Sequence, residues 1–452
     1  MVYRYNNLYT RSFMKKVILV AFVLLFISKA SFSQNVISLF NSANNFFQLL
    51  TEEKYTEAYS NFDETVKAKL SEEQLKKLWT DINQSLGKAK ALDATQSKTQ
   101  GEFFAVTVEG EFERGSQNFI LGFNKTQKIV GFFLAPKPSV TKYLAPSYAD
   151  TTLYSEKQAY ITDGKHQLAA VITTPKNNKN FPMVVFVHGS GPGDMDETVG
   201  PNKPFKDLAA GLAAQGIGSI RYVKRTLIYP YEFGKAFTVK EEVLDDAQSA
   251  LAMAKTIPGA DLKNIYLFGH SLGGMLAPRI ATAVPDLGGI ILAAAPARKL
   301  TDMIEEQNKY LFEKTNDTAK NAKAQFDLAI KEIDKGRITQ LGTIKPDSII
   351  LGLPASYWID LNNYNQVAAA QKLTKPRIFV IQGGNDYQVS KQDFDLWKAG
   401  LANNKNAEFK FYPELNHLLS QQVEKGTGAQ YQSFSSVSAT LINDIVAWIK
   451  IK

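Results

Sequence analysis

The pentapeptide at residues 269–273, GHSLG, has the G-x-S-x-G spacing of a nucleophile elbow, a sharp turn that presents a serine hydroxyl. It follows the apolar run Ile265–Phe268 and precedes a helix-prone stretch, which predicts a strand, a tight turn and a helix around Ser271. The two outer glycines would leave the space that the neighbouring strand and helix need. The turn would also direct the backbone N–H of Leu272 toward the place where an oxyanion forms. The alternative interpretation is a glycine-rich turn whose serine has no chemical use.

A serine hydroxyl becomes a nucleophile only when a base takes its proton and another group orients that base. The chain contains four histidines, at positions 166, 188, 270 and 417. His417 follows the last predicted strand and precedes the carboxyl-terminal helix, and it is the candidate base. Asp386 closely follows the predicted strand Ile378–Ile381, and it is the candidate acid. The alternative interpretations are a turn aspartate for Asp386 and a capping or buried polar role for His417.

A second glycine-rich segment, HGSGPG at residues 188–193, follows the predicted strand Met183–Val187. This position suits an oxyanion loop, in which the N–H of Ser190 is the second donor beside the N–H of Leu272. His188 is then expected to shape the loop rather than to act as the base.

The remaining candidates are less well placed for catalysis. His270 lies inside the pentapeptide, and its ring is expected to point away from the Ser271 hydroxyl. His166 lies in a turn-like stretch and is expected at the surface. Asp393 and Asp395 are alternative acids, but both fall inside the following predicted helix and would point less well.

Apolar strand candidates alternate with helices from about residue 151 onward, which predicts an α/β domain with a mostly parallel sheet covered on both faces. An earlier segment, Leu168–Thr173, is expected to form an antiparallel edge strand. The other strand candidates are Met183–Val187, Ser219–Tyr222, Ile265–Phe268, Gly289–Ala293, Ile378–Ile381 and Glu408–Phe411.

The alternation stops between about residues 298 and 373, where charged, helix-prone sequence predicts a helical insertion between the sixth and seventh strands. Such an insertion would lie over the carboxyl ends of the strands as a lid, and the alternative is a peripheral helical decoration. Its apolar side chains would line an acyl or aryl pocket or pack against the sheet; they are Met303, Leu311, Phe312, Phe326, Leu341, Leu351, Tyr357 and Trp358.

The segment before this domain has a different character. Helical patterning followed by strand-like segments predicts a small α+β domain over residues 34–135, with no catalytic motif. Prolines mark a linker over residues 136–150, which leaves residues 151–452 for the larger domain.

Residues 1–33 have the pattern of a signal peptide. Lys15 and Lys16 precede the apolar run Val17–Ile27, which is short for a membrane-spanning helix, and Met14 is an alternative start. Small residues at Ser31 and Ser33 predict cleavage before Gln34, and therefore a secreted or periplasmic protein without stable membrane insertion. The alternative is an uncleaved anchor.

Charge and composition exclude several classes of function. Of the net charge of +8, five positive charges lie in residues 1–33, which contain no acid, so the rest of the chain carries only +3. No lysine- and arginine-rich block stands out elsewhere, and we expect no nucleic-acid partner. The 452 residues contain no cysteine, which excludes a cysteine nucleophile, a thiolate metal site and a disulfide framework.

The segments that carry the candidate residues together resemble the exported bacterial serine esterases of the α/β-hydrolase superfamily, some of which have a small α+β domain before the hydrolase domain. The resemblance covers about residues 151–452. It implies that Ser271 is the nucleophile, Asp386 the acid and His417 the base, with Ser190 and Leu272 as oxyanion donors and no metal or organic cofactor. The segments are VHGSGP at 187–192, RY at 221–222, GHSLGG at 269–274, APAR at 295–298, QGGNDYQV at 382–389 and LNHL at 415–418.

One segment departs from the pattern of these relatives. The segment is RYVKRT at residues 221–226, where relatives commonly carry an aspartate and a glycine after the tyrosine. This loop is expected to border the active site, so the departure bears on substrate preference rather than on the catalytic residues.

The sequence therefore predicts a serine hydrolase of the α/β-hydrolase fold that cleaves carboxylic esters of small molecules through an acyl-enzyme. An acyl thioesterase or a peptidase would use the same residues. A non-catalytic binding protein on a hydrolase scaffold is the alternative from another class.

Overall fold

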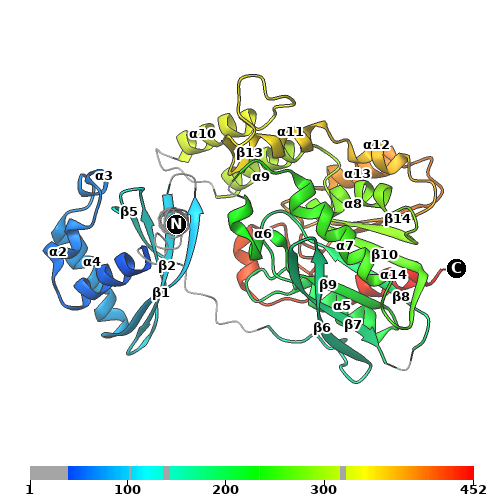
Figure 1. Cartoon of the computed structure of the whole chain (residues 1–452), viewed down its shortest axis with the longest axis horizontal. Helices are drawn as coiled ribbons and strands as arrows, with labels where there is room; N and C mark the ends of the chain where they lie inside the picture. The colour runs from blue at the N-terminus through cyan, green and yellow to red at the C-terminus, as the bar shows by residue number, and fades with distance from the viewer. Residues whose placement is uncertain are drawn as a thin grey trace, which may run out of the picture. The chain divides into compact units, whose positions relative to one another are not determined.

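The computed structural model describes residues 39–100, 103–135, 143–176, 178–233, 235–315 and 322–451, and the chain divides into two compact units (Figure 1). The first unit is Met1–Pro138 and the second is Ser139–Lys452. The predicted signal peptide lies outside the described residues. Within the described ranges, no helix is long and apolar enough to cross a membrane.

The first unit combines helices with one antiparallel sheet. Residues 39–51 are helical, and α2 (Tyr55–Ser60), α3 (Glu64–Lys67) and α4 (Glu72–Leu86) follow. Helix α4 is capped at its amino end, because the Ser71 hydroxyl accepts from the Gln74 N–H and the Gln74 side chain accepts from the Ser71 N–H. The sheet has the order β1-β2-β4-β5, and β3 pairs with β2. Its strands are β1 (Ala89–Gln100), β2 (Phe103–Phe112), β3 (Gly115–Ser116), β4 (Phe119–Phe123) and β5 (Ile129–Leu134).

The second unit is built on an eight-stranded sheet with the order β15-β14-β11-β10-β8-β9-β7-β6. The strands from β9 to β15 in this order are parallel, whereas β7 and β6 at the other edge are antiparallel. The fold is therefore the predicted α/β-hydrolase fold. The strands are β6 (Tyr154–Asp163), β7 (His166–Pro175), β8 (Phe181–Val187), β9 (Gly218–Tyr222), β10 (Ala260–His270), β11 (Gly289–Ala293), β14 (Arg377–Gly383) and β15 (Ala407–Tyr412).

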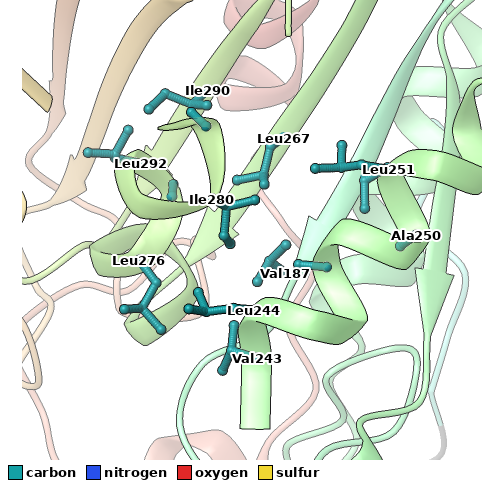
Figure 2. Packing of buried hydrophobic residues seen from close by; sticks show 14 of the residues in the cluster. Val187, Val243, Leu244, Ala250, Leu251, Leu267, Leu276, Ile280, Ile290 and Leu292 are labelled. Carbon is teal, nitrogen blue, oxygen red and sulfur yellow. The ribbon is translucent and has the colours of Figure 1, made fainter. Parts of the chain in front are cut away.

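Helices cover both faces of this sheet, because successive strand residues point to opposite sides. One face packs against α7 (Asp245–Ala254), α8 (Leu272–Ala283) and α13 (Lys391–Gly400), and Figure 2 shows Val187, Leu267 and Leu292 from the strands beside Leu251 and Ile280 from α7 and α8. The other face packs against α5 (Pro204–Ala214) and α14 (Ala439–Lys450). The apolar side chains buried on the two faces hold the strands in place, and the candidate residues follow the carboxyl ends of these strands.

The expected helical insertion lies between β11 and β14, the sixth and seventh strands of the sheet. It contains α9 (Leu300–Thr315), α10 (Ala322–Lys335), a short β12–β13 hairpin (Ile349–Ile350, Leu353–Pro354), α11 (Ala355–Asn363) and α12 (Gln366–Gln371). In Figure 1, α9, α10 and α11 gather at one end of the second unit. Single-turn elements complete the unit: α6 (Arg225–Ile228), η1 (Pro230–Phe233), the π-turn η2 (Lys240–Leu244) and η3 (Gly428–Gln432).

Candidate active site

Ser271 stands on a strained turn between β10 and α8. Its backbone has φ 52° and ψ −119°, in a region that residues with a side chain rarely occupy. The flanking glycines are required by close backbone contacts. A Cβ at Gly269 would lie 2.3 Å from the carbonyl oxygen of Gly273, and a Cβ at Gly273 would lie 2.3 Å from that of Val187. The strain is thus held in place by the packing of β10, α8 and β8, as a nucleophile elbow requires.

Asp386 and His417 are brought together by the loops after β14 and β15. Oδ2 of Asp386 lies 2.8 Å from Nδ1 of His417, and both residues are buried. The other carboxylate oxygen, Oδ1, accepts from the N–H groups of Gln388 (2.7 Å) and Val389 (2.9 Å), which fixes the carboxylate. Because the carboxylate accepts the proton on Nδ1, Nε2 of His417 remains free to accept another. His417 and Ser271 line the same cavity.

The loop after β8 is anchored on both sides of Ser190. The N–H of Gly189 donates to Glu197 (2.7 Å) and the N–H of Gly191 donates to Glu242 (2.9 Å). Among the hydrogen bonds of the described residues, none engages the N–H of Ser190 or of Leu272. Ser190 lines the cavity and Leu272 directly follows Ser271, and the N–H groups of both are left without a partner in these bonds.

The other two histidines that line the cavity, His188 and His270, have structural partners. Nε2 of His188 lies 2.8 Å from the Asp194 carbonyl oxygen, and burial lowers the pKa of His188 to about 4, so its ring is neutral. His270 lies between the Glu197 carboxylate, 2.9 Å from its Nδ1, and the His417 carbonyl oxygen, 2.8 Å from its Nε2. His270 has a partner at each ring nitrogen, whereas the partner of His188 occupies Nε2 and leaves Nδ1 without a hydrogen bond among the described residues.

The expectation for His166 was wrong. This residue opens β7 and is buried, with Nε2 2.7 Å from Glu232, because the apparent turn is the tight β6–β7 hairpin. The alternative acids have other partners. Asp393 is buried on α13 and accepts from the Arg298 guanidinium, whereas Asp395 pairs with Lys391 on the exposed face of the same helix.

The cavity over Ser271 has a volume of about 630 Å³, a size that accommodates a small organic molecule. The insertion forms one part of the cavity wall, and this part is largely apolar. Its apolar residues are Leu300, Met303, Ile304, Leu351, Leu353, Tyr357 and Trp358. The acidic groups that line it, Glu197 and Glu242, are each paired with a basic group. Within the described part of the chain, no cluster of histidine and acidic side chains could hold a metal ion.

Sequence reasoning missed three residues at the cavity: Glu197, Lys224 and Glu242. Lys224 lies in the segment that departs from the relatives, which was the available signal for it. Glu197 and Glu242 lie in polar stretches that carry no motif. Only the folded chain shows that both carboxylates reach the loop after β8.

A curated relative shows the family to which this chain belongs. Esterase EstD of Thermotoga maritima is 34% identical over 404 residues, which are 89% of this chain and 93% of the relative. The chain belongs to the family of this esterase. This chain is accordingly an esterase, an ester hydrolase of the α/β-hydrolase fold.

Two family profiles and several solved structures match parts of the esterase. Residues 236–424 match the family described as serine aminopeptidase, S33, and residues 43–132 match the family described as a protein of unknown function (DUF3887). Est1E from Butyrivibrio proteoclasticus is 15% identical, with a TM-score of 0.43 over 65% of this chain and 99% of its own. The esterase domain of a Rhodothermus marinus protein is 13% identical, with a TM-score of 0.40 over 65% and 97%.

Proposed function

We propose that the esterase cleaves carboxylic esters with Ser271 as nucleophile, His417 as general base and Asp386 as the residue that orients the base. The observation that carries this proposal is the 2.8 Å contact between Asp386 and His417 at the cavity that Ser271 also lines. A carboxylate on Nδ1 leaves Nε2 as the proton acceptor, which is the tautomer that a serine hydrolase needs.

The reaction would proceed through an acyl-enzyme. Ser271 Oγ attacks the ester carbonyl carbon while His417 takes the hydroxyl proton, and the N–H groups of Ser190 and Leu272 stabilise the oxyanion. His417 then returns the proton to the leaving alcohol as the C–O bond breaks. Water attacks the acyl group by the same steps in reverse and releases the carboxylic acid.

The charges at the cavity favour an ester over a peptide with a free amino end. An aminopeptidase needs an acidic group that can bind the α-ammonium of its substrate. The acidic side chains of the cavity wall are already neutralised, Glu197 by His270 and Glu242 by Lys224. The apolar side chains with which the insertion lines the cavity instead suit an acyl chain or an aromatic group of the substrate. In this position the insertion would act as a lid over Ser271.

Hydrolysis of p-nitrophenyl acetate, butyrate and decanoate by the chain from Gln34 onward tests this function. Ser271→Ala is expected to abolish hydrolysis and keep the fold. A matched control is Ser390→Ala, which replaces a serine outside the cavity wall, and it is expected to retain activity. Equal rates for the wild type and Ser271→Ala would exclude the proposed nucleophile.

We further propose that the esterase is exported to the periplasm or secreted. The basic residues, short apolar run and small residues of segment 1–33 support this proposal. Expression in a bacterial host with fractionation and amino-terminal sequencing tests it. The expected result is a periplasmic or secreted protein that begins at Gln34, and a cytoplasmic protein with an intact amino end would contradict it.

A further inference from the structure

Lys224 and Glu242 form a buried ion pair beneath the loop after β8. Nζ of Lys224 lies 2.7 Å from Oε1 of Glu242, and each side chain is only 3% exposed. Two charges withdrawn from water in this way are costly, and their mutual attraction often does no more than offset the loss of hydration. The pair is therefore poorly explained as a device for stability alone.

Both members of the pair bond to the backbone on either side of Ser190. Nζ of Lys224 donates to the carbonyl oxygen of Gly189 (2.8 Å), and Oε1 of Glu242 accepts from the N–H of Gly191 (2.9 Å). The backbone N–H of Lys224 also donates to the carbonyl oxygen of Gly193 (3.0 Å). The segment around Ser190 is thus fixed to the Lys224 side chain, to the Glu242 side chain and to the Lys224 backbone.

The bond from Lys224 determines where the Ser190 N–H points. The Gly189 carbonyl and the Ser190 N–H belong to one peptide group, which is planar and trans, so the C=O and N–H bonds point in opposite directions. An ammonium that holds the carbonyl on one side therefore directs the N–H to the other. It also polarises the peptide group, which strengthens the N–H as a hydrogen-bond donor.

We propose that Lys224 and Glu242 are a positioning pair that presents the Ser190 N–H to the oxyanion. The proposal rests on the proposed function, in which Ser190 and Leu272 stabilise the tetrahedral intermediate. It also gives a role to Lys224, which lies in the segment 221–226 that departs from the pattern of the relatives. Neither Lys224 nor Glu242 touches the reacting atoms in this account.

A neighbouring ion pair provides a matched control. Arg225 directly follows Lys224, and Asp246 lies four residues after Glu242. Both are buried, and Nε of Arg225 lies 2.9 Å from Oδ1 of Asp246. Their hydrogen bonds do not reach the loop at residues 188–193. Replacement of this pair disturbs a buried ion pair of the same kind without releasing the Gly189 carbonyl.

The kinetic test compares the double variants Lys224→Met/Glu242→Leu and Arg225→Met/Asp246→Leu with the wild type on p-nitrophenyl butyrate. Double replacement avoids an unpaired buried charge that could unfold a single variant. The first variant is expected to lose about 10-fold to 100-fold in kcat with KM nearly unchanged, somewhat less than the loss of a whole oxyanion donor. The second is expected to keep its kcat.

Three outcomes of this test would overturn the proposal. They are a wild-type kcat in Lys224→Met/Glu242→Leu, a change confined to KM, or an equal loss of kcat in both double variants. Rescue gives a further check, because Lys224→Arg keeps a cationic donor beside Glu242 and is expected to retain more kcat than Lys224→Met/Glu242→Leu.

A crystal structure of Lys224→Met/Glu242→Leu separates this proposal from the proposed function. We expect the Gly189–Ser190 peptide to be rotated, with its N–H turned from the cavity. A peptide in the original orientation would overturn the positioning role. If the wild type hydrolyses no ester, the proposed function fails, and the orientation of this peptide still decides whether Lys224 and Glu242 control it.

Discussion

The carboxylate of Glu197 lies 2.9 Å from Nδ1 of His270, at the start of the turn that carries Ser271. The opposite ring nitrogen, Nε2, lies 2.8 Å from the carbonyl oxygen of His417. Both ring nitrogens of His270 therefore face acceptor oxygens, an arrangement that favours the protonated ring. Glu197 also accepts the N–H of Gly189, so one buried pair joins the oxyanion loop, the nucleophile turn and the loop of the base.

This arrangement predicts an unusual titration of His270. Burial disfavours its charged form, but the Glu197 carboxylate outweighs burial and raises the pKa of His270 above the ordinary 6.5. Its contribution to stability is therefore complete below pH 6.5 and is lost as the pH rises through the higher folded value. Ring NMR of the four histidines is expected to show His270 still protonated above pH 6.5 and His188 titrating near 4.

Glu197→Gln provides the control for that titration. The amide keeps the shape of the side chain but removes the negative charge, so the pKa of His270 is expected to fall. A His270 ring that titrates at the same pH in Glu197→Gln and in the wild type would contradict the pairing.

Asp386 and Asp393 are expected to differ in their effects on catalysis. Asp386→Asn removes the carboxylate that holds the His417 tautomer, and kcat is expected to fall by up to about 10⁴-fold with little loss of stability. Asp393→Asn weakens the contact with Arg298 and is expected to cost about 2 kcal/mol in unfolding free energy. Its kcat, measured below the unfolding transition, is expected to change less than about 3-fold. A large kcat loss for Asp393→Asn alone would reverse the assignment of the acid.

Asp207 on α5 is expected to make stability depend on pH. It accepts from the Tyr143 hydroxyl (2.9 Å) and the Val437 N–H (3.0 Å), but burial dominates and raises its pKa to about 6. A raised folded pKa means that the stabilising contribution is complete below about pH 4 and is lost as the pH rises through 6. Asp207→Asn should therefore gain about 2 kcal/mol relative to the wild type between pH 4 and pH 7. Urea unfolding across this range measures the difference, and a constant difference would contradict it.

Met303 of α9 tests whether the insertion contributes to the substrate pocket. It is 1% exposed and lines the cavity, so a larger side chain there would remove space for a long acyl group. Met303→Trp is expected to lower kcat/KM for p-nitrophenyl decanoate by more than about 10-fold and to change acetate hydrolysis little. Leu328→Trp is the control, because Leu328 on α10 is 59% exposed and lies outside the cavity wall. An unchanged preference in Met303→Trp would assign the insertion a peripheral role.

Much of the fold could be predicted because buried parallel strands consist of continuous apolar residues. β8, β11 and β14 carry such runs, and the alternation of these strands with helices indicated the sheet. β1 could not be recognised in this way, because its sequence, AKALDATQSKTQ, contains no continuous apolar run. β6 was missed for a related reason, since most of its side chains are exposed at the sheet edge.

The candidate site was predictable only as far as short motifs reach. Ser271 directly follows β10, and Asp386 and His417 lie in the loops after β14 and β15, so their positions indicated that they would meet at one edge of the sheet. The carboxylates that hold the loop at residues 188–193 were not predictable, because Glu197 and Glu242 reach this loop from segments without a motif. Their partners depend on how those segments fold back, which the spacing of residues does not encode.

Detection of an acyl group on Ser271 tests the proposed mechanism most directly. The esterase would be mixed with p-nitrophenyl butyrate, quenched in acid within the first turnover, digested and analysed by mass spectrometry. The expected result is a butyryl group on the peptide that contains Ser271, absent from the Ser271→Ala variant. Continued hydrolysis with no acyl group on Ser271, or with the acyl group on another residue, would contradict the proposed mechanism.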